Sequence, residues 1–332
     1  MHTSIRLALS ATRTRMVASQ STGPKVLIMG ATGAQGGSVL THLLASDKPY
    51  QLAALTRDPS KPNAKEIEQK GVEVVKGDTA DVKSLEEAFK GREVVFGLTN
   101  FWSHMSYDKE VAEGRSIVDA AKAAGVKTLV WSGLENAKEV SGGKVAGVEH
   151  FDSKSEVTKY ARSIGGLKVL NVEPGCYMTN FLGGAMGPRR SSSGNSDEVL
   201  FSFPMRPEGK IALLATKEDY GAYVRAALED EKLSKDGGEV LAASDELSVE
   251  EMVKQWSEVT GHKARFVQQS DADYLSNFPG NYAKAGEELL EMLRWFDGYG
   301  YYGGKSIEPS QRILKGKVHS WRDWCKAQQW QV

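Results

Sequence analysis

Short apolar runs alternate with longer amphipathic segments through the first half of the chain. Six apolar runs predict buried strands, at 26–29, 51–56, 72–76, 94–98, 128–131 and 168–172. The segments between them have the 3.6-residue period of helices, at 35–44, 60–70, 83–90, 108–124 and 153–163. Continuous apolar runs joined by helices are typical of parallel strands buried on both faces. The pattern predicts an α/β fold with a Rossmann-type doubly wound parallel sheet.

The alternation stops after Pro174, and a different pattern follows. Residues 186–198 are rich in Gly, Pro, Arg and Ser, which predicts an exposed loop. Helices are predicted near 218–229, 249–259, 284–296 and 320–329. We therefore expect a Rossmann domain at 24–175 and a smaller α+β lobe at 176–332 that binds a substrate or a partner. Late strands and helices of this lobe could return to the Rossmann core.

The first 23 residues differ in composition from the rest of the chain. No Asp or Glu occurs before Asp47, and Arg6, Arg13 and Arg15 lie among Ser, Thr, Ala and Leu. This composition resembles a mitochondrial transit peptide, although a disordered leader is the simpler interpretation and the one we favour. We expect a cytoplasmic protein that could also enter the nucleus, or a mitochondrial protein if residues 1–23 are a transit peptide.

Charge and cysteine content exclude several kinds of partner. The net charge of −1 over 332 residues gives no general attraction to nucleic acid or to an anionic membrane. No apolar run approaches the length of a membrane span. The two cysteines, Cys176 and Cys325, have no metal-ligand spacing. We therefore expect no direct nucleic-acid binding, no membrane contact and no metal site.

Three glycines, Gly30, Gly33 and Gly36, follow the first predicted strand and open the first predicted helix. Glycine permits the sharp strand-to-helix turn and lets the backbone approach a pyrophosphate, which then binds the free N–H groups of the helix N-terminus. This context favours a dinucleotide-binding loop over a plain turn. The residues predicted to contact the dinucleotide phosphates are Gly30, Thr32, Gly33, Ala34, Gln35 and Gly36.

The end of the second strand distinguishes NADP from NAD. Arg57 lies 21 residues after Gly36, where an arginine accommodates a 2′-phosphate and a carboxylate would bind the ribose 2′-hydroxyl. The Arg57 guanidinium can bind phosphate through two hydrogen bonds, and Lys61 could assist it. If Asp58 faces the ribose instead, NAD is preferred. We favour NADP(H) as the cofactor, with NAD as the alternative.

Several motifs resemble the NmrA-like family, an atypical branch of the short-chain dehydrogenase/reductases. They occur in family order over most of residues 25–182: Gly-Ala-Thr-Gly-Ala-Gln-Gly-Gly at 30–37, Thr56-Arg57, Gly77-Asp78, Thr99-Asn100-Phe101-Trp102, Phe151-Asp152-Ser153-Lys154, and Pro174 to Asn180. The resemblance implies a role for each matching position. Asp78 would contact the adenine, Thr99 and Asn100 would line the dinucleotide groove, Lys154 would reach the nicotinamide ribose, and Tyr177 and Asn180 would flank the nicotinamide and the substrate cleft.

Short-chain dehydrogenases use Tyr-x-x-x-Lys on a helix, with a serine after the fifth strand. Here Ser132 follows the fifth predicted strand and Lys154 is present, but His150 stands four residues before the lysine. Histidine can act as a general acid near neutral pH. However, a neighbouring lysine that would lower the pKa of a tyrosine also disfavours the protonated imidazole. Ser132, His150 and Lys154 are therefore candidate catalytic residues of an atypical site.

Two functions fit this pattern. The one we favour here is a non-catalytic NADP(H)-responsive regulator, in which the cofactor shifts a conformational or oligomeric equilibrium and changes the binding of a protein partner. The alternative is an NADPH-dependent reductase of a small carbonyl or enone compound bound in the cleft, with His150, Ser132 or a substrate group as the proton source.

Overall fold

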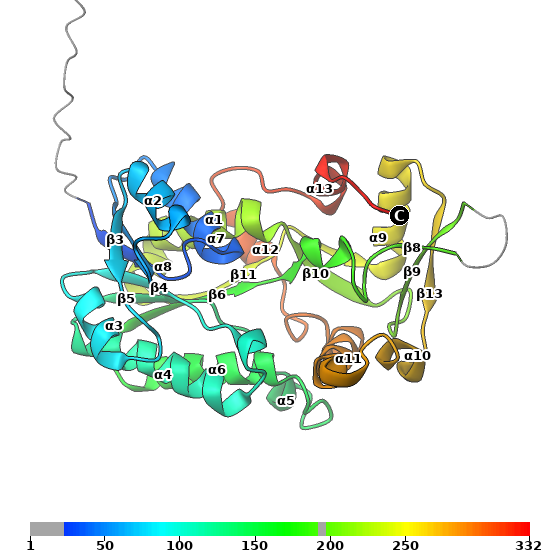
Figure 1. Ribbon diagram of the computed structural model, residues 1–332, viewed down its shortest axis with the longest axis horizontal. Coiled ribbons are helices and arrows are strands. Elements are labelled where there is room, and N and C mark those ends of the chain that lie inside the picture. The colour runs from blue at the N-terminus through cyan, green and yellow to red at the C-terminus, as the bar shows by residue number, and fades with distance from the viewer. Residues whose placement is uncertain (1–22, 192–196) are drawn as a thin grey trace, which may run out of the picture.

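The computed structural model describes residues 23–191 and 197–332 (Figure 1). Of the leader predicted at 1–23, only Gly23 is among the described residues. The middle of the loop predicted at 186–198 also lies outside them.

A seven-stranded parallel sheet forms the centre of the molecule. The strands are β1 (Lys25–Ile28), β2 (Gln51–Thr56), β3 (Glu73–Lys76), β4 (Val94–Gly97), β5 (Thr128–Trp131), β6 (Lys168–Pro174) and β11 (Gly238–Ala242). Their order is β11-β6-β5-β4-β1-β2-β3, and each pair is parallel. The order reverses between β1 and β4, which is where such sheets bind ligands at the carboxyl ends of their strands. All six predicted strands are present, and the prediction of a Rossmann-type sheet is confirmed.

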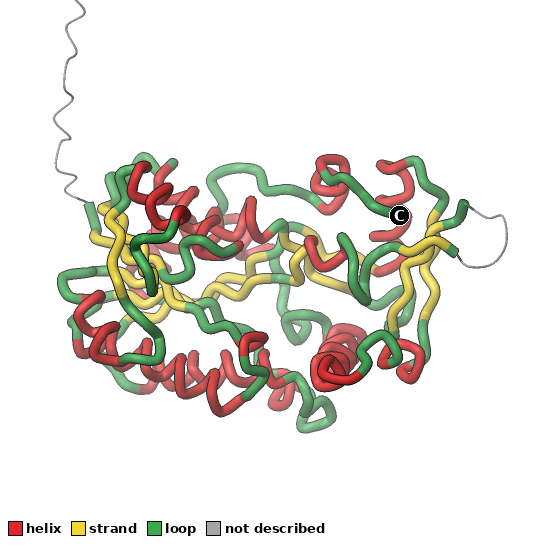
Figure 2. Tube along the Cα trace, in the orientation of Figure 1, coloured by secondary structure: helices red, strands yellow, loops and turns green. Residues whose placement is uncertain are grey.

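Helices cover both faces of this sheet (Figures 1 and 2). One layer contains α1 (Ala34–Leu44), α2 (Pro62–Gln69) and α7 (Thr216–Glu229), and the other contains α3 (Val82–Phe89), α4 (Tyr107–Ala123) and α6 (Glu149–Ser163). Successive strand residues face opposite layers, so that Val26 and Ile28 pack in the first and Leu27 in the second. Burial on both faces explains why the strands appear in the sequence as continuous apolar runs.

The C-terminal half contributes to the Rossmann core and also forms a smaller lobe. Strand β11 and helix α7 complete the core, and two three-stranded sheets, ordered β12-β10-β7 and β13-β9-β8, form the lobe. Their strands are β7 (Cys176–Tyr177), β8 (Arg189–Arg190), β9 (Val199–Phe203), β10 (Lys210–Leu214), β12 (Asp245–Ser248) and β13 (Ala264–Gln268). The main lobe helices are α9 (Val249–Thr260), α10 (Asp271–Leu275), α11 (Ala283–Tyr299) and α13 (Trp321–Ala327). The lobe has its own apolar core, rich in tryptophan and phenylalanine.

Shorter elements connect these parts. They are α5 (Ala137–Val140), α8 (Glu231–Asp236), α12 (Glu308–Arg312) and the 3-10 turns η1 (Phe101–Ser103), η2 (Met178–Phe181) and η3 (Gly280–Tyr282). Within the described residues, no helix combines the length and the apolar character needed to cross a membrane.

Helix α7 crosses α1 at backbone contact distance. A Cβ atom on Gly221 would lie 2.1 Å from the carbonyl oxygen of Ser38. The Gly221 amide instead donates a hydrogen bond of 2.9 Å to the Ser38 hydroxyl. His42 in α1 also contacts α7, through a 2.7 Å hydrogen bond to the carbonyl of Glu218. Because α1 begins in the glycine loop, this crossing ties the C-terminal half to the loop that is predicted to bind phosphate.

Gly221→Ala is expected to lower the free energy of unfolding by about 1–3 kcal/mol, because the added methyl group collides with the backbone of α1. Gly298→Ala, in α11, is the matched control, since nothing lies within 4 Å of its added Cβ. Alanine at an open helical position stabilises by up to about 1 kcal/mol. Urea denaturation measures both changes, and equal midpoints for the two variants would contradict the close crossing.

Candidate functional site

The glycine loop has the geometry of an anion-binding turn. Gly30 has φ of +62°, a conformation that disfavours side chains, and its carbonyl accepts a 2.8 Å hydrogen bond from Gly33 N–H. A Cβ on Gly36 would lie 2.4 Å from the Gly30 carbonyl, so only glycine fits there. Gly33 precedes α1 and provides no side-chain cap, and Thr32 and Ala34 are exposed beside it. The first amides of α1 are therefore left for an anionic ligand.

Gln35 and Tyr177, both predicted to contact the cofactor, contact each other. Gln35 Nε2 donates a 2.5 Å hydrogen bond to the Tyr177 hydroxyl. Tyr177 lies in β7, immediately after the sixth strand of the sheet. Burial raises the pKa of Tyr177 to about 12, so the phenol is neutral. The Oε1 atom of Gln35 is buried and lacks a hydrogen-bond partner within the described residues, which leaves an acceptor at the first turn of α1.

At the end of β2, the arginine and the aspartate have different surroundings. Asp58 Oδ1 accepts hydrogen bonds of 2.9 Å and 2.6 Å from the amide and hydroxyl of Ser60. These hydrogen bonds lower the pKa of Asp58 and hold its carboxylate in the local turn. Arg57 and Lys61 are exposed, and neither side chain has a hydrogen-bond or ion-pair partner in the described part of the chain. The Arg57 guanidinium is therefore unpaired, beside a carboxylate that is hydrogen-bonded to Ser60 and is also stabilised by the nearby charge of Lys61.

The other residues predicted to line the groove follow strands β3, β4 and β7. Asp78 Oδ1 accepts a 3.1 Å hydrogen bond from Ala80 N–H, so this aspartate closes the turn before α3. Asn100 and Asn180 are both exposed, one directly before η1 and the other within η2. The Asn180 amide lies 3.8 Å from the buried Cys176 sulfur.

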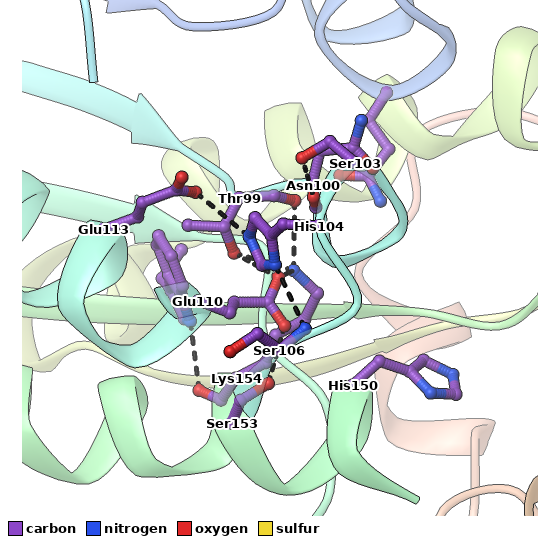
Figure 3. A network of polar contacts seen from close by, with 12 residues as sticks. Thr99, Asn100, Ser103, His104, Ser106, Glu110, Glu113, His150, Ser153 and Lys154 are labelled. Atoms are coloured by element: carbon purple, nitrogen blue, oxygen red, sulfur yellow. Dashed lines mark hydrogen bonds and ion pairs between the residues drawn. The ribbon is translucent and has the colours of Figure 1, made fainter. Parts of the chain in front are cut away.

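A buried carboxylate, Glu110 in α4, is the centre of a polar network (Figure 3). Its Oε1 accepts hydrogen bonds from the Thr99 hydroxyl at 2.6 Å and from Lys154 Nζ at 2.7 Å. Its Oε2 accepts one from the Ser153 hydroxyl at 2.6 Å. Burial alone would raise the pKa of Glu110, but the Lys154 charge and these hydrogen bonds hold it below its usual value. Glu110 is therefore ionised, and it joins α4, α6 and the end of β4.

Lys154 has all its partners within this network. Its Nζ donates to Glu110 and also to the carbonyl and hydroxyl oxygens of Thr99, at 3.1 Å and 2.9 Å. An ammonium group has three protons, and three protein oxygens accept them. The side chain is 12% exposed. Lys154 therefore positions the residues at the end of β4.

His150 lies in the first turn of α6, because this helix begins four residues earlier than the predicted 153–163. Glu288 of α11 accepts two hydrogen bonds through its Oε1, from His150 N–H at 2.9 Å and from His150 Nδ1 at 2.5 Å. The imidazole centroid lies 5.1 Å from the Trp102 ring and 4.8 Å from the Phe151 ring. Figure 3 shows His150 turned away from Lys154, so the two side chains do not form a tyrosine–lysine type pair.

Ser132, the third candidate catalytic residue, lies elsewhere. It directly follows β5, is 1% exposed and lies near Tyr220 of α7, whose hydroxyl donates a 2.9 Å hydrogen bond to the Val172 carbonyl. The preceding residue, Trp131, packs in the α3/α4/α6 layer, and its indole donates to the Lys154 carbonyl at 3.3 Å. Because neighbouring strand residues face opposite layers, Ser132 faces α7 and is separated from His150 and Lys154.

The sequence analysis missed Glu110 and Glu288. Each leaves a signal in the sequence, since each is a charged residue in the apolar stripe of a predicted helix. Glu110 is followed by buried residues at 114, 117, 118 and 121, and Glu288 by buried residues at 292, 295 and 296. A charge in such a stripe requires a buried partner, but the identity of that partner depends on the fold. Over the described ranges, no group of His, Cys, Asp and Glu side chains could hold a metal ion.

Comparisons with known proteins agree with this architecture. The chain is 30% identical over 317 residues to the NmrA-like family domain-containing oxidoreductase ptmS of Penicillium ochrochloron, covering 92% of this chain and 93% of that protein. Its fold resembles NmrA, a negative transcriptional regulator solved with NADP (TM-score 0.75, 18% identity, 92% and 95% of the two chains). It also resembles the Escherichia coli quinone oxidoreductase QOR2 solved with NADPH (TM-score 0.71, 20% identity, 90% and 98%). The profile of the NmrA-like family matches residues 22–328, and the chain belongs to the NmrA-like family, as its motifs predict.

Proposed function

We propose that this chain is an NADP(H)-dependent oxidoreductase that reduces a small carbonyl or enone compound. The observation that carries the proposal is the unpaired Arg57 beside an Asp58 whose carboxylate binds Ser60. A 2′-phosphate needs cations and would be repelled by a free carboxylate, so this arrangement favours NADP(H) over NAD(H). The oxidoreductase class is supported by ptmS, a relative of similar length that carries that name.

The residues of the cleft fit a dinucleotide. The uncapped start of α1 and the buried, unpartnered Oε1 of Gln35 offer polar groups near the pyrophosphate. Arg57 and Lys61 would bind the 2′-phosphate, and Asp78 would lie near the adenine. Thr99, Asn100, Tyr177 and Asn180 would line the nicotinamide end, where Lys154 orients Thr99. When bound there, NADPH supplies the hydride.

The regulator favoured by the sequence pattern is the second candidate. One observation supports it: Lys154 is bound to Glu110 and Thr99 and has no tyrosine to activate. Under this alternative the chain would bind NADP(H) without turnover, and the dinucleotide would change the affinity of the chain for a protein partner.

The NADP(H) assignment predicts a selective effect of Arg57→Ala. The variant is expected to bind NADPH roughly 10- to 150-fold more weakly, because charged hydrogen bonds contribute about 1.5–3 kcal/mol. NADH binding should change little, since NADH has no 2′-phosphate. Isothermal titration calorimetry measures both affinities. Arg162→Ala, an exposed arginine of α6, controls for the loss of one positive charge. Equal losses for NADPH and NADH would contradict the role of Arg57.

Glu110→Gln tests the network that holds Lys154. The variant leaves the Lys154 ammonium buried without its counter-ion, so the free energy of unfolding is expected to fall by about 3 kcal/mol. The double variant Glu110→Gln/Lys154→Met removes both charges and should recover much of this loss. Chemical denaturation of the wild type, Glu110→Gln, Lys154→Met and the double variant forms a double-mutant cycle. Additive losses would show that the two charges are not coupled.

Turnover separates the two candidate functions. The wild-type protein is expected to oxidise NADPH when supplied with a panel of enones, quinones and aldehydes, followed by absorbance at 340 nm. Arg57→Ala should raise the KM for NADPH while leaving kcat within a few-fold, because it acts on cofactor binding. Tight NADPH binding without oxidation by any compound of the panel would contradict the reductase and support the regulator.

A further inference from the structure

We propose that His150 and Glu288 form the acid–base pair of this site, and that the substrate is a flat conjugated carbonyl compound stacked on Trp102. This proposal rests on the proposed reductase function and supplies its proton donor. His150 Nε2 would donate the proton to the substrate oxygen, and Glu288, on the C-terminal lobe, would fix and stabilise the imidazole.

Hydrogen bonding determines which nitrogen of His150 is available. A carboxylate can only accept hydrogen bonds, so the 2.5 Å contact with Glu288 Oε1 requires a proton on Nδ1. The same oxygen accepts a 2.9 Å hydrogen bond from the His150 backbone amide, which fixes Glu288 against the start of α6. The imidazole side chain is 9% exposed. Its Nε2 has no hydrogen-bond partner among the described residues. Nε2 is therefore the one ring atom that can exchange a proton with a ligand.

The charged groups around His150 are arranged differently from what the linear sequence suggests. In the linear sequence, Lys154 four residues away would oppose an imidazolium. In the structure, the Lys154 charge is paired with Glu110 at 2.7 Å, and the lysine points away from His150 (Figure 3). Glu288, only 4% exposed, places a negative charge directly on Nδ1. A buried carboxylate on Nδ1 orients a catalytic histidine and stabilises its positive form.

Trp102 indicates the kind of substrate. Its ring centroid lies 5.1 Å from that of His150, yet 45% of the residue is exposed. Every other tryptophan in the described residues is buried or half-buried. An exposed indole beside an unpartnered Nε2 offers a flat apolar surface that a conjugated ring or enone would cover by stacking. The carbonyl oxygen of such a compound could then reach the imidazole, whereas a highly polar sugar or a charged acid would gain little from this surface.

The proton transfer balances with the hydride that the cofactor supplies. As hydride adds to a carbon of the conjugated carbonyl system, the π electrons move onto the carbonyl oxygen. That oxygen takes the proton from Nε2 of the imidazolium, which becomes a neutral imidazole and regains a proton from solvent. The substrate gains one hydride and one proton, so it is reduced by two electrons while the dinucleotide is oxidised.

Kinetics of matched variants provide the first test. His150→Gln is expected to lower kcat at least about 100-fold, the usual contribution of general acid catalysis, with an unchanged affinity for NADPH. Glu288→Met removes the acceptor and should also lower kcat strongly, whereas Glu288→Gln restores an acceptor without charge and should recover part of the loss. His319→Gln is the control. Nδ1 of His319 also pairs with a buried carboxylate, that of Asp219 in α7, at 2.9 Å.

Nuclear magnetic resonance gives a readout that does not depend on turnover. In protein labelled with ¹⁵N-histidine, Nδ1 of His150 should carry a proton, in the neutral Nδ1–H form or in the imidazolium, as assigned by comparison with His150→Gln. Glu288→Met should shift it toward the Nε2–H form, and Glu288→Gln should retain the Nδ1–H form. An Nε2–H form of His150 in the wild-type protein overturns the proposal even if some variants fail to fold.

The substrate assignment is tested with Trp102→Leu. This variant should raise the KM for an enone or quinone about tenfold or more and leave kcat within twofold, and an unchanged KM overturns the stacking role. Normal turnover in His150→Gln overturns the acid–base pair but leaves the reductase function intact. Absence of turnover in the wild-type protein with every conjugated carbonyl overturns both.

Discussion

The arrangement of this site depends on one buried charge, the carboxylate of Glu110. An ionised group with no exposure is stable only when its oxygens are fully paired, and here Thr99, Ser153 and Lys154 provide the donors. Because these partners lie at the end of β4 and on α6, the network fixes α6 against the carboxyl edge of the sheet. The position of His150, one helical turn before Lys154, follows from this attachment.

The C-terminal half completes the Rossmann core and also contributes to the site. Strand β11 and helix α7 extend the sheet and one of its helical layers, and the contact between Gly221 and Ser38 brings α7 against α1. Helix α11 of the lobe contributes Glu288, which accepts a hydrogen bond from the His150 amide at the start of α6. A carboxylate at a helix N-terminus is favoured by the helix dipole. Movement of the lobe would therefore disturb the histidine directly.

The site distributes its charges differently from the tyrosine–lysine arrangement of short-chain dehydrogenases. There, one lysine lowers the pKa of a tyrosine and binds the ribose. Here the lysine is paired with Glu110 and the histidine is hydrogen-bonded to Glu288, so each of the two side chains has its own carboxylate. Lys154 and His150 lie on the same helix, α6, but their side chains point in different directions (Figure 3). Separate pairing removes the repulsion between lysine and imidazolium that the linear sequence suggests.

The sequence by itself determined the local features of this protein. Strand and helix periods, and the glycines at 30, 33 and 36, depend on backbone geometry over a few residues, so they predicted the parallel sheet and the phosphate loop. Tertiary structure decided the rest. Strand β11 lies at the sheet edge and has a mixed burial pattern, so only its pairing with β6 reveals it. Hydrogen bonds from Ser60 hold the Asp58 carboxylate in its local turn. The alternation of strand residues places Ser132 on the α7 side of the sheet. Glu288 contacts His150, which lies 138 residues away in the sequence. A buried charge requires a partner, but tertiary packing decides which residue that partner is.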